Sequence, residues 1–321
     1  MNRVVRIGTR ESELAVWQAM QVKQLLHNSG YQSELVFIKS EGDIDLKTPL
    51  YEMGVQGIFT RSLDIALLND RIDVAVHSLK DVPTQLPEGI VQCAVLKRGS
   101  HKDLLVFKGA VDSLQLTVDS SSFATHLPIA IGTPFTIATS SIRRKAQWLH
   151  RYPDHTIENL RGNVNTRLKK LDESNWSGAI FAAAGLERIG LRPENAIELD
   201  WMLPAPAQGA VGVVCRKDDS FAFEACQLFN DHDTELCTKI ERGFLRTLLG
   251  GCSTPVSALA EIKNNSVYFK GNIFSIDGKE KVEIEKNIPL INVEEAGKVA
   301  AIELLNNGGK QIADNIRNAG K

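Results

Sequence analysis

Residues 73–83 read Asp-Val-Ala-Val-His-Ser-Leu-Lys-Asp-Val-Pro. The stretch begins as an apolar, β-branched run, which predicts a buried strand. It ends in Lys80-Asp81, and Pro83 then prevents regular strand pairing from continuing. In open α/β sheets, ligands bind in the crevice beyond the ends of such strands. We therefore expect Asp81 to act there on a cationic reaction centre; a solvated turn with two ordinary surface charges is the alternative.

Around this stretch, predicted strands and helices alternate, which favours an α/β fold with a mainly parallel sheet. Residues 3–8 predict a strand and residues 12–28 an amphipathic helix. A polar, Gly-containing break at residues 97–102 marks the first domain boundary. The alternation restarts from residue 104, and residues 210–215 predict one more strand.

After Cys252 the pattern changes. Residues 256–262 and 267–274 alternate around a Lys-Asn-Asn turn, and Asp277-Gly278 predicts a second tight turn before residues 281–284. A helix is predicted over residues 293–306. These features predict a separate C-terminal α+β domain with a small antiparallel sheet.

The composition is that of an ordinary globular protein: 321 residues, 43% hydrophobic and 24% charged. The net charge of −2 predicts no nucleic-acid partner from bulk charge. The N-terminus has no signal-peptide pattern, and no apolar run is long enough to span a membrane. We therefore expect a cytoplasmic protein without a membrane partner.

The five cysteines are odd in number and form no CxxC pair, so neither a disulfide framework nor a zinc site is indicated, and no metal is expected. Cys252 follows Gly250-Gly251, which allow a sharp turn that presents the thiol on a loop. The thiol follows the negative end of a predicted helix, which disfavours a thiolate. Cys252 is therefore better suited to be a permanent anchor, captured once by a strong electrophile; a buried, inert cysteine is the alternative.

Arg143 and Arg144 lie in the first turn of a helix predicted over residues 141–150. Cations there oppose the positive end of the helix dipole, and free backbone N–H groups point outward at that end. Together with the hydroxyls of the preceding Thr139-Ser140-Ser141, they favour an anion site. Two exposed arginines on a surface helix are the alternative.

The same arrangement recurs at other predicted junctions between strands and helices. Arg161 follows a strand and Arg167 lies on the next helix, Arg188 lies in a short helix, and Arg10 precedes a helix that begins near Ser12. Several guanidiniums at such junctions suggest a ligand with several carboxylates or phosphates. The chain has no GxxxxGK[ST] loop, which argues against a nucleoside triphosphate.

Six motifs in order resemble the porphobilinogen deaminase family, also called hydroxymethylbilane synthase, from Arg6 to about Gly309. They are Arg6-Ile7-Gly8-Thr9-Arg10-Glu11-Ser12, Val76-His77-Ser78-Leu79-Lys80-Asp81-Val82-Pro83, Thr139-Ser140-Ser141-Ile142-Arg143-Arg144, Leu160-Arg161-Gly162-Asn163-Val164, Pro206-Ala207-Gln208-Gly209-Ala210 and Gly250-Gly251-Cys252.

The resemblance implies a transferase that joins four porphobilinogen units head to tail, releasing ammonia, into the linear tetrapyrrole hydroxymethylbilane. It implies Asp81 as the catalytic group and a dipyrromethane cofactor held by a thioether to Cys252. Cofactor contacts are implied for Ser78, Lys80, Asp81, Thr139, Ser140, Ser141, Arg143, Arg144 and Arg167. Substrate contacts are implied for Arg10, Ser12, Arg161, Arg167 and Arg188.

The resemblance also implies three domains, the first two similar to a type 2 periplasmic binding protein. Combined with the predicted elements, this places domain 1 at residues 1–98 and 202–217, domain 2 at 103–201, and the α+β domain 3, with the cysteine loop, at 218–321. A monomer is expected.

This sequence departs from the family pattern in two places. Glu52 and Gln56 stand where the family usually has lysines, and Arg61-Ser62 replaces a Lys-Glu pair, so the role of the segment over residues 41–62 is open. Leu249 replaces a common Glu before the two glycines.

Two other functions stay open. A non-enzymatic, two-lobed binding protein for a small polycarboxylate would explain the arginines, but it explains neither Cys252 nor the third domain. A cysteine-dependent hydrolase would need an activating histidine motif, and none is evident near Cys252.

Overall fold

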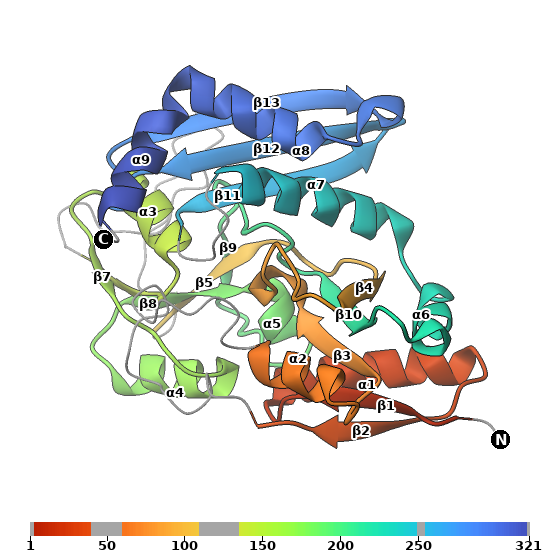
Figure 1. The fold of residues 1–321 in the computed structure, drawn as a ribbon. Helices are drawn as coiled ribbons and strands as arrows, with labels where there is room; N and C mark the ends of the chain where they lie inside the picture. The colour runs from red at the N-terminus through yellow and green to blue at the C-terminus, as the bar shows by residue number, and fades with distance from the viewer. Residues whose placement is uncertain (1–2, 40–59, 109–134, 249–253, 320–321) are drawn as a thin grey trace.

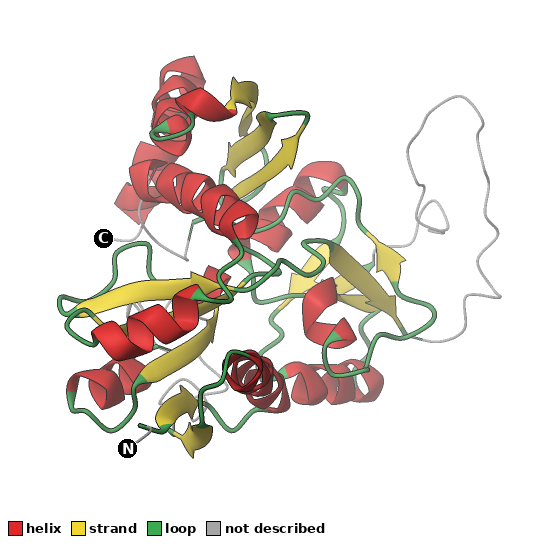
Figure 2. Cartoon of the chain, turned by 90° about the vertical axis from the view of Figure 1, so that its right-hand side faces the viewer, coloured by secondary structure: helices red, strands yellow, loops and turns green. Residues whose placement is uncertain are grey.

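The computed structural model describes residues 3–39, 60–108, 135–248 and 254–319. Its strands form three sheets, each packed with helices (Figure 1). Figure 2 gives the view turned by 90°. Cys252 and residues 41–59 of the segment over residues 41–62 lie outside the described residues.

The first sheet has the order β2-β1-β3-β10-β4. Its strands are β1 (Val5–Thr9), β2 (Ser33–Phe37), β3 (Val74–Ser78), β4 (Ile90–Val95) and β10 (Val211–Arg216). Helices α1 (Glu13–Asn28) and α6 (Ser220–Gln227) cover one face, and α2 (Arg61–Leu68) packs on the other. Burial on both faces explains why residues 74–76 form a continuous apolar run rather than an alternating one.

The second sheet has the order β7-β6-β8-β5-β9. Its strands are β5 (Asp103–Phe107), β6 (Thr136–Ala138), β7 (Thr156–Glu158), β8 (Gly178–Ala182) and β9 (Ile197–Glu198). Its helices are α3 (Ile142–Arg151), α4 (Val164–Glu173) and α5 (Ala183–Glu187). Trp148 of α3 is fully buried in one of its two apolar clusters.

The two sheets share one plan. In each, three neighbouring strands are parallel and the fourth in the order, β10 or β5, runs antiparallel to both of its neighbours. The antiparallel strand follows a connection from the other sheet: β5 follows residues 96–102 and β10 follows residues 199–210. We call these two connections the crossovers. The expected mainly parallel direction therefore holds for four strands of each sheet, and the fifth is reversed because the chain enters it from the other lobe.

The third sheet has the order β11-β12-β13 and is antiparallel throughout. Its elements are β11 (Val256–Lys263), β12 (Ser266–Phe274), β13 (Lys281–Pro289), α7 (His232–Leu248), α8 (Ala296–Leu304) and α9 (Lys310–Ala319). Asn264 and Asn265 both adopt positive φ, 50° and 62°, as a two-residue hairpin turn requires. The fold class is thus the expected one: two α/β domains and a small C-terminal sheet domain.

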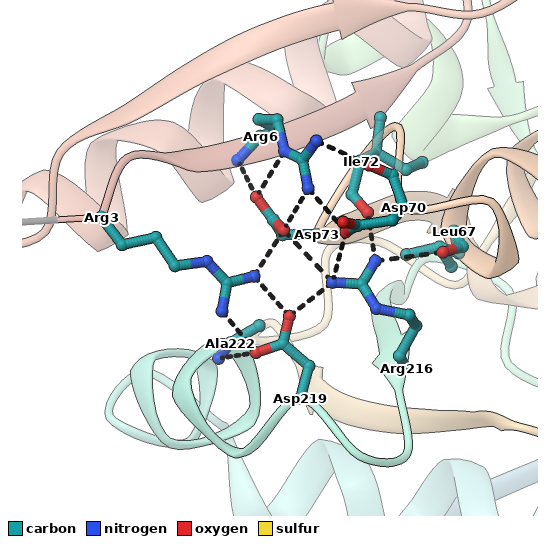
Figure 3. Close-up of polar contacts among 9 residues, drawn as sticks. All are labelled: Arg3, Arg6, Leu67, Asp70, Ile72, Asp73, Arg216, Asp219 and Ala222. Carbon is teal, nitrogen blue, oxygen red and sulfur yellow. Dashed lines mark hydrogen bonds and ion pairs between the residues drawn. The ribbon is translucent and has the colours of Figure 1, made fainter.

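An ionic cluster fixes β10 in the first sheet at the end opposite Asp81 (Figure 3). Asp73, just before β3, accepts from the Arg6 amide at 2.8 Å and pairs with the Arg3 guanidinium at 2.5 Å. Arg216, at the end of β10, pairs with Asp219 at 2.7 Å and Asp73 at 3.3 Å. Burial alone would raise the pKa of Asp73, but the bonds from Arg6 and Arg3 hold it well below its usual range.

Candidate functional site

The strand predicted at the start of residues 73–83 is confirmed as β3, which ends at Ser78, and Asp81 closes a short 3₁₀ turn, Leu79–Asp81. Leu79 is buried with Val82, Val95 and Ala210, which anchors the turn to the first domain. Lys80 and Asp81 are half-buried. The pair is thus partly desolvated, which favours a site at this turn over the alternative of two ordinary solvated surface charges.

The electrostatics place several predicted residues around this turn. Burial lowers the pKa of Lys80 to about 8, with Arg144 and Arg143 lowering it and Asp81 and Asp103 raising it. Burial and the charge of Arg144 likewise lower the pKa of Arg167 to about 10, opposed by Asp81. Because Coulomb effects of this kind need proximity, the turn of the first domain and these cations of the second form one charged site.

Arg143 and Arg144 differ from the expectation for surface arginines. Both are buried, and they share the carboxylate of Asp103, which is itself fully buried. Arg144 Nε and Nη2 donate to Asp103 Oδ1 at 3.0 and 2.8 Å, and Arg143 Nη1 pairs with Oδ2 at 2.8 Å. Two guanidiniums and one carboxylate leave one net positive charge. The buried Asp103 carboxylate therefore partly neutralises the arginine pair within the protein, and the alternative of two exposed surface arginines is wrong.

Asp103 and Gln208 were not singled out as functional residues from the sequence, although Gln208 lies in a quoted motif. Gln208 is 1% exposed; its Nε2 donates to Asp103 Oδ1 at 2.9 Å and to the His101 carbonyl at 2.8 Å. Its own carbonyl accepts from Arg98 Nε at 2.8 Å. Gln208 thus joins the two crossovers to the arginine pair. Only its place in a motif, between two predicted domains, could have pointed to it.

The predicted hydroxyls lie at strand ends with local partners. Thr139 Oγ1 accepts from the Ser141 amide, Ser140 Oγ donates to the Leu160 carbonyl at 2.6 Å, and Ser141 Oγ caps α3 by accepting from the Arg144 amide. Ser78 Oγ accepts from Gln18 Nε2 at 2.9 Å. These hydroxyls order the loops that border the charged site.

At the start of α1, Arg10 is half-buried and Ser12 is the N-cap residue. The His77 side chain is 6% exposed, and its Nε2 has no hydrogen-bond partner within the part of the chain that the structure describes. Burial, and then the charge of Arg10, lower the pKa of His77 to about 4. His77 is therefore neutral at neutral pH, and Arg10 lies within electrostatic reach of the strand that leads to Asp81.

Arg161, Arg167 and Arg188 have different settings. Arg161 is 3% exposed and lies within electrostatic reach of Arg167, whose Nε donates to the Gly162 carbonyl at 2.7 Å. Arg188 instead donates from Nη2 to the Gly209 carbonyl at 2.6 Å, and its guanidinium lies 5.4 Å from the ring centroid of Trp17 on α1. Arg161 and Arg167 thus belong to the charged site, whereas Arg188 bridges the second domain to α1 and a crossover.

Across residues 3–39, 60–108, 135–248 and 254–319, no cluster of three or more His, Cys, Asp or Glu side chains is arranged to hold a metal ion. Over the same ranges, none of the helices combines the length and apolarity needed to cross a membrane.

Comparison with known proteins gives two family matches. Residues 5–224 match the porphobilinogen deaminase dipyromethane cofactor binding domain, and residues 235–306 match the porphobilinogen deaminase C-terminal domain. Among solved structures, the methionine binding protein MetQ aligns with 72% of this chain and 91% of its own, at 14% identity and a TM-score of 0.42.

Two relatives cover nearly the whole chain. The porphobilinogen deaminase of Pelobacter propionicus is 38% identical over 318 residues, covering 98% of this chain and 97% of that protein. The porphobilinogen deaminase of Chlorobium phaeobacteroides is 38% identical over 325 residues, covering 99% of each. The chain therefore belongs to the porphobilinogen deaminase family.

Proposed function

We propose that this protein polymerises four porphobilinogen molecules stepwise, with release of ammonia, into hydroxymethylbilane. Growth begins on a dipyrromethane cofactor bound by a thioether to Cys252. The family membership carries the reaction and the cofactor. The gathering of Lys80, Arg144 and Arg167 around Asp81 supports the assignment of the site.

The charged and polar groups around Asp81 fit a dipyrromethane. Such a group carries four carboxylates and two pyrrole N–H donors. Asp81 can accept from pyrrole N–H groups, and the cations near it can pair with carboxylates, each charge-assisted bond contributing about 1.5–3 kcal/mol. When bound, the dipyrromethane supplies the free pyrrole carbon to which the first substrate unit is joined.

The chemistry explains why a carboxylate is needed. Loss of ammonia from the aminomethyl group of porphobilinogen leaves a delocalised cation, and a proton must leave after carbon–carbon bond formation. Asp81, fixed on its turn, stabilises that positive charge and accepts or passes on the proton. The half-buried setting strengthens the attraction because water screens it less.

The remaining roles are part of the same proposal. We assign cofactor contacts to Ser78, Lys80, Thr139, Ser140, Ser141, Arg143, Arg144 and Arg167, and substrate contacts to Arg10, Ser12, Arg161, Arg167 and Arg188. We keep domain boundaries at residues 98, 103, 202 and 218 as part of the proposal; the crossovers support the first three, whereas α6 (Ser220–Gln227), which follows residue 218, packs on the first sheet. From the family resemblance we further propose a cytoplasmic monomer; light scattering should then give the mass of one chain.

The substitution Asp81→Asn tests the function because it removes the charge and keeps the size of the side chain. We expect the rate to fall by about 10²–10³-fold or more, while the fold is kept. The matched control is Asp200→Asn, at an exposed aspartate paired with Lys102 on the surface, which should turn over normally.

Turnover is measured as hydroxymethylbilane formed from porphobilinogen, and intact mass reports the covalent group. Wild-type protein should carry an adduct of two pyrrole units that maps to Cys252. Normal turnover of Asp81→Asn would remove Asp81 from the mechanism, and an unmodified, alkylatable Cys252 in wild type would refute the proposed cofactor.

A further inference from the structure

Helix α7 of the C-terminal domain makes a direct contact with the turn that carries Asp81. The Arg242 guanidinium donates to three carbonyls: Leu79 at 3.1 Å, Val82 at 2.8 Å and Pro83 at 2.7 Å. These three carbonyls bracket Lys80 and Asp81 in the sequence. One side chain, about 160 residues away, thus holds both ends of the turn.

The turn has few hydrogen bonds of its own. Leu79–Asp81 is a single 3₁₀ turn, with the Val82 amide donating to the Leu79 carbonyl at 3.3 Å. The Leu79 amide donates to the Ala210 carbonyl at 3.0 Å. Short 3₁₀ segments have poor hydrogen-bond geometry and are weakly stable alone. Arg242 therefore supplies much of the bonding that fixes this turn.

Arg242 is itself on a rigid support. The preceding residue, Glu241, is fully buried and pairs with Arg98 at 2.6 Å. Its carboxylate also accepts from the amides of Ala207 at 2.6 Å and Ala260 at 2.8 Å. Glu241 thus ties this part of α7 to both crossovers and to β11, so the Arg242 backbone has little freedom to shift.

We propose that Arg242 is a positioning residue for Asp81: it couples the turn that carries the carboxylate to α7. This inference rests on the proposed function, in which Asp81 acts on the reacting cation. Helix α7 ends at Leu248, four residues before Cys252 in the sequence. The catalytic turn and the helix that leads to the anchoring cysteine are thus held together by one guanidinium.

The consequence is a specific kinetic signature. Because Arg242 acts through Asp81 and not on substrate carboxylates, its loss should lower kcat and leave KM for porphobilinogen within about twofold. Misplacement of a catalytic group by about 1 Å can cost about 10²-fold in rate. We expect this loss of kcat for Arg242→Met. Arg242→Lys keeps the charge, but an ammonium cannot donate to all three carbonyls in the same geometry. Its kcat should therefore fall about tenfold.

Arg216→Met is the matched control. Arg216 also holds a turn of the first domain, donating to the carbonyls of Leu67 at 3.0 Å and Ile72 at 2.7 Å, but at the opposite end of the strands (Figure 3). The Arg216→Met protein should unfold at a lower urea concentration than wild type, and its kcat should equal that of wild type. Backbone amide exchange of a peptide spanning residues 77–86 should be faster in Arg242→Met and unchanged in Arg216→Met.

The experiment measures kcat, KM and amide exchange on the full-length proteins, with Asp81→Asn in parallel. The positioning role would be overturned, and the proposed function left intact, by either of two results. One is a kcat of Arg242→Met equal to that of Arg216→Met, and the other is a fall in kcat/KM that comes from a higher KM. If Arg242→Met does not fold, Arg242→Lys decides by the same criteria. Normal turnover of Asp81→Asn would instead overturn the proposed function, and this inference with it.

Discussion

The substitution Asp103→Asn should be among the most destabilising single changes in the second domain. Asp103 is fully buried and receives the guanidiniums of Arg143 and Arg144 at 2.8–3.0 Å and Gln208 Nε2 at 2.9 Å. Asn keeps the volume but removes the charge, which leaves two buried guanidiniums without an anion. Breaking a buried ion pair in this way typically costs about 3–5 kcal/mol, and we expect a loss of that size in the free energy of unfolding.

Urea unfolding at pH 7, followed by the fluorescence of tryptophan, measures the effect; Trp148 lies buried on the same helix as the two arginines. Asp200→Asn is the control and should cost less than about 1 kcal/mol, because its carboxylate is exposed. A loss of less than about 1 kcal/mol for Asp103→Asn would refute the argument.

The pH dependence gives a second check. Burial would raise the pKa of Asp103, but Arg143 and Arg144 hold it well below its usual range. The stabilisation is therefore present above the unfolded-state pKa of about 4 and is lost as pH falls below it. The stability gap between wild type and Asp103→Asn should narrow between about pH 4 and pH 2, and a constant gap would contradict the assignment.

Two further predictions concern the cations of the site. Because the pKa of Lys80 is lowered to about 8, its ammonium, and with it the proposed ion pair with a cofactor carboxylate, is lost as pH rises through that value. The turnover rate should therefore fall there, and Lys80→Arg should remove this limb of the pH–rate profile because a guanidinium stays charged. An unchanged limb in Lys80→Arg would exclude Lys80 as its source. Arg188→Met should lower the free energy of unfolding by about 2 kcal/mol, since it loses the bond to the Gly209 carbonyl and the contact with Trp17, and should raise KM about tenfold. A loss of stability in urea without a change in KM would restrict Arg188 to the contact between domains.

The sequence predicted well those features that depend on neighbours along the chain. The apolar run before Ser78, the helix after Ser141 and the hairpin at Asn264-Asn265 all form, because periodicity and turn chemistry are local signals. The prediction from the apolar run that Asp81 lies just beyond the end of a strand is therefore confirmed.

The partners of the site residues could not be predicted from the same signals. Asp103 is the first residue of β5, and nothing in its neighbourhood in the sequence shows that it lies buried between two arginines about 40 residues away. The contact of Arg242 with the turn at residues 79–83 spans about 160 residues and depends on how three domains pack. The reversed direction of β10 likewise follows from the crossover and not from its apolar pattern.

The electrostatics of the site explain how a chain of net charge −2 can bind a polyanion. Lys80 lies within electrostatic reach of Arg143 and Arg144, and Arg167 within reach of Arg144 and Arg161. With Asp81 and Asp103, these five cations leave an excess of three positive charges. Burial and mutual repulsion lower the pKa values of Lys80 and Arg167, so the folded protein holds these charges at a free-energy cost. In the proposed function, carboxylates of the bound pyrroles relieve this repulsion, so ligand binding should also stabilise the folded protein. The preorganised, partly repulsive cations thus favour a ligand with many carboxylates over one with a single charge.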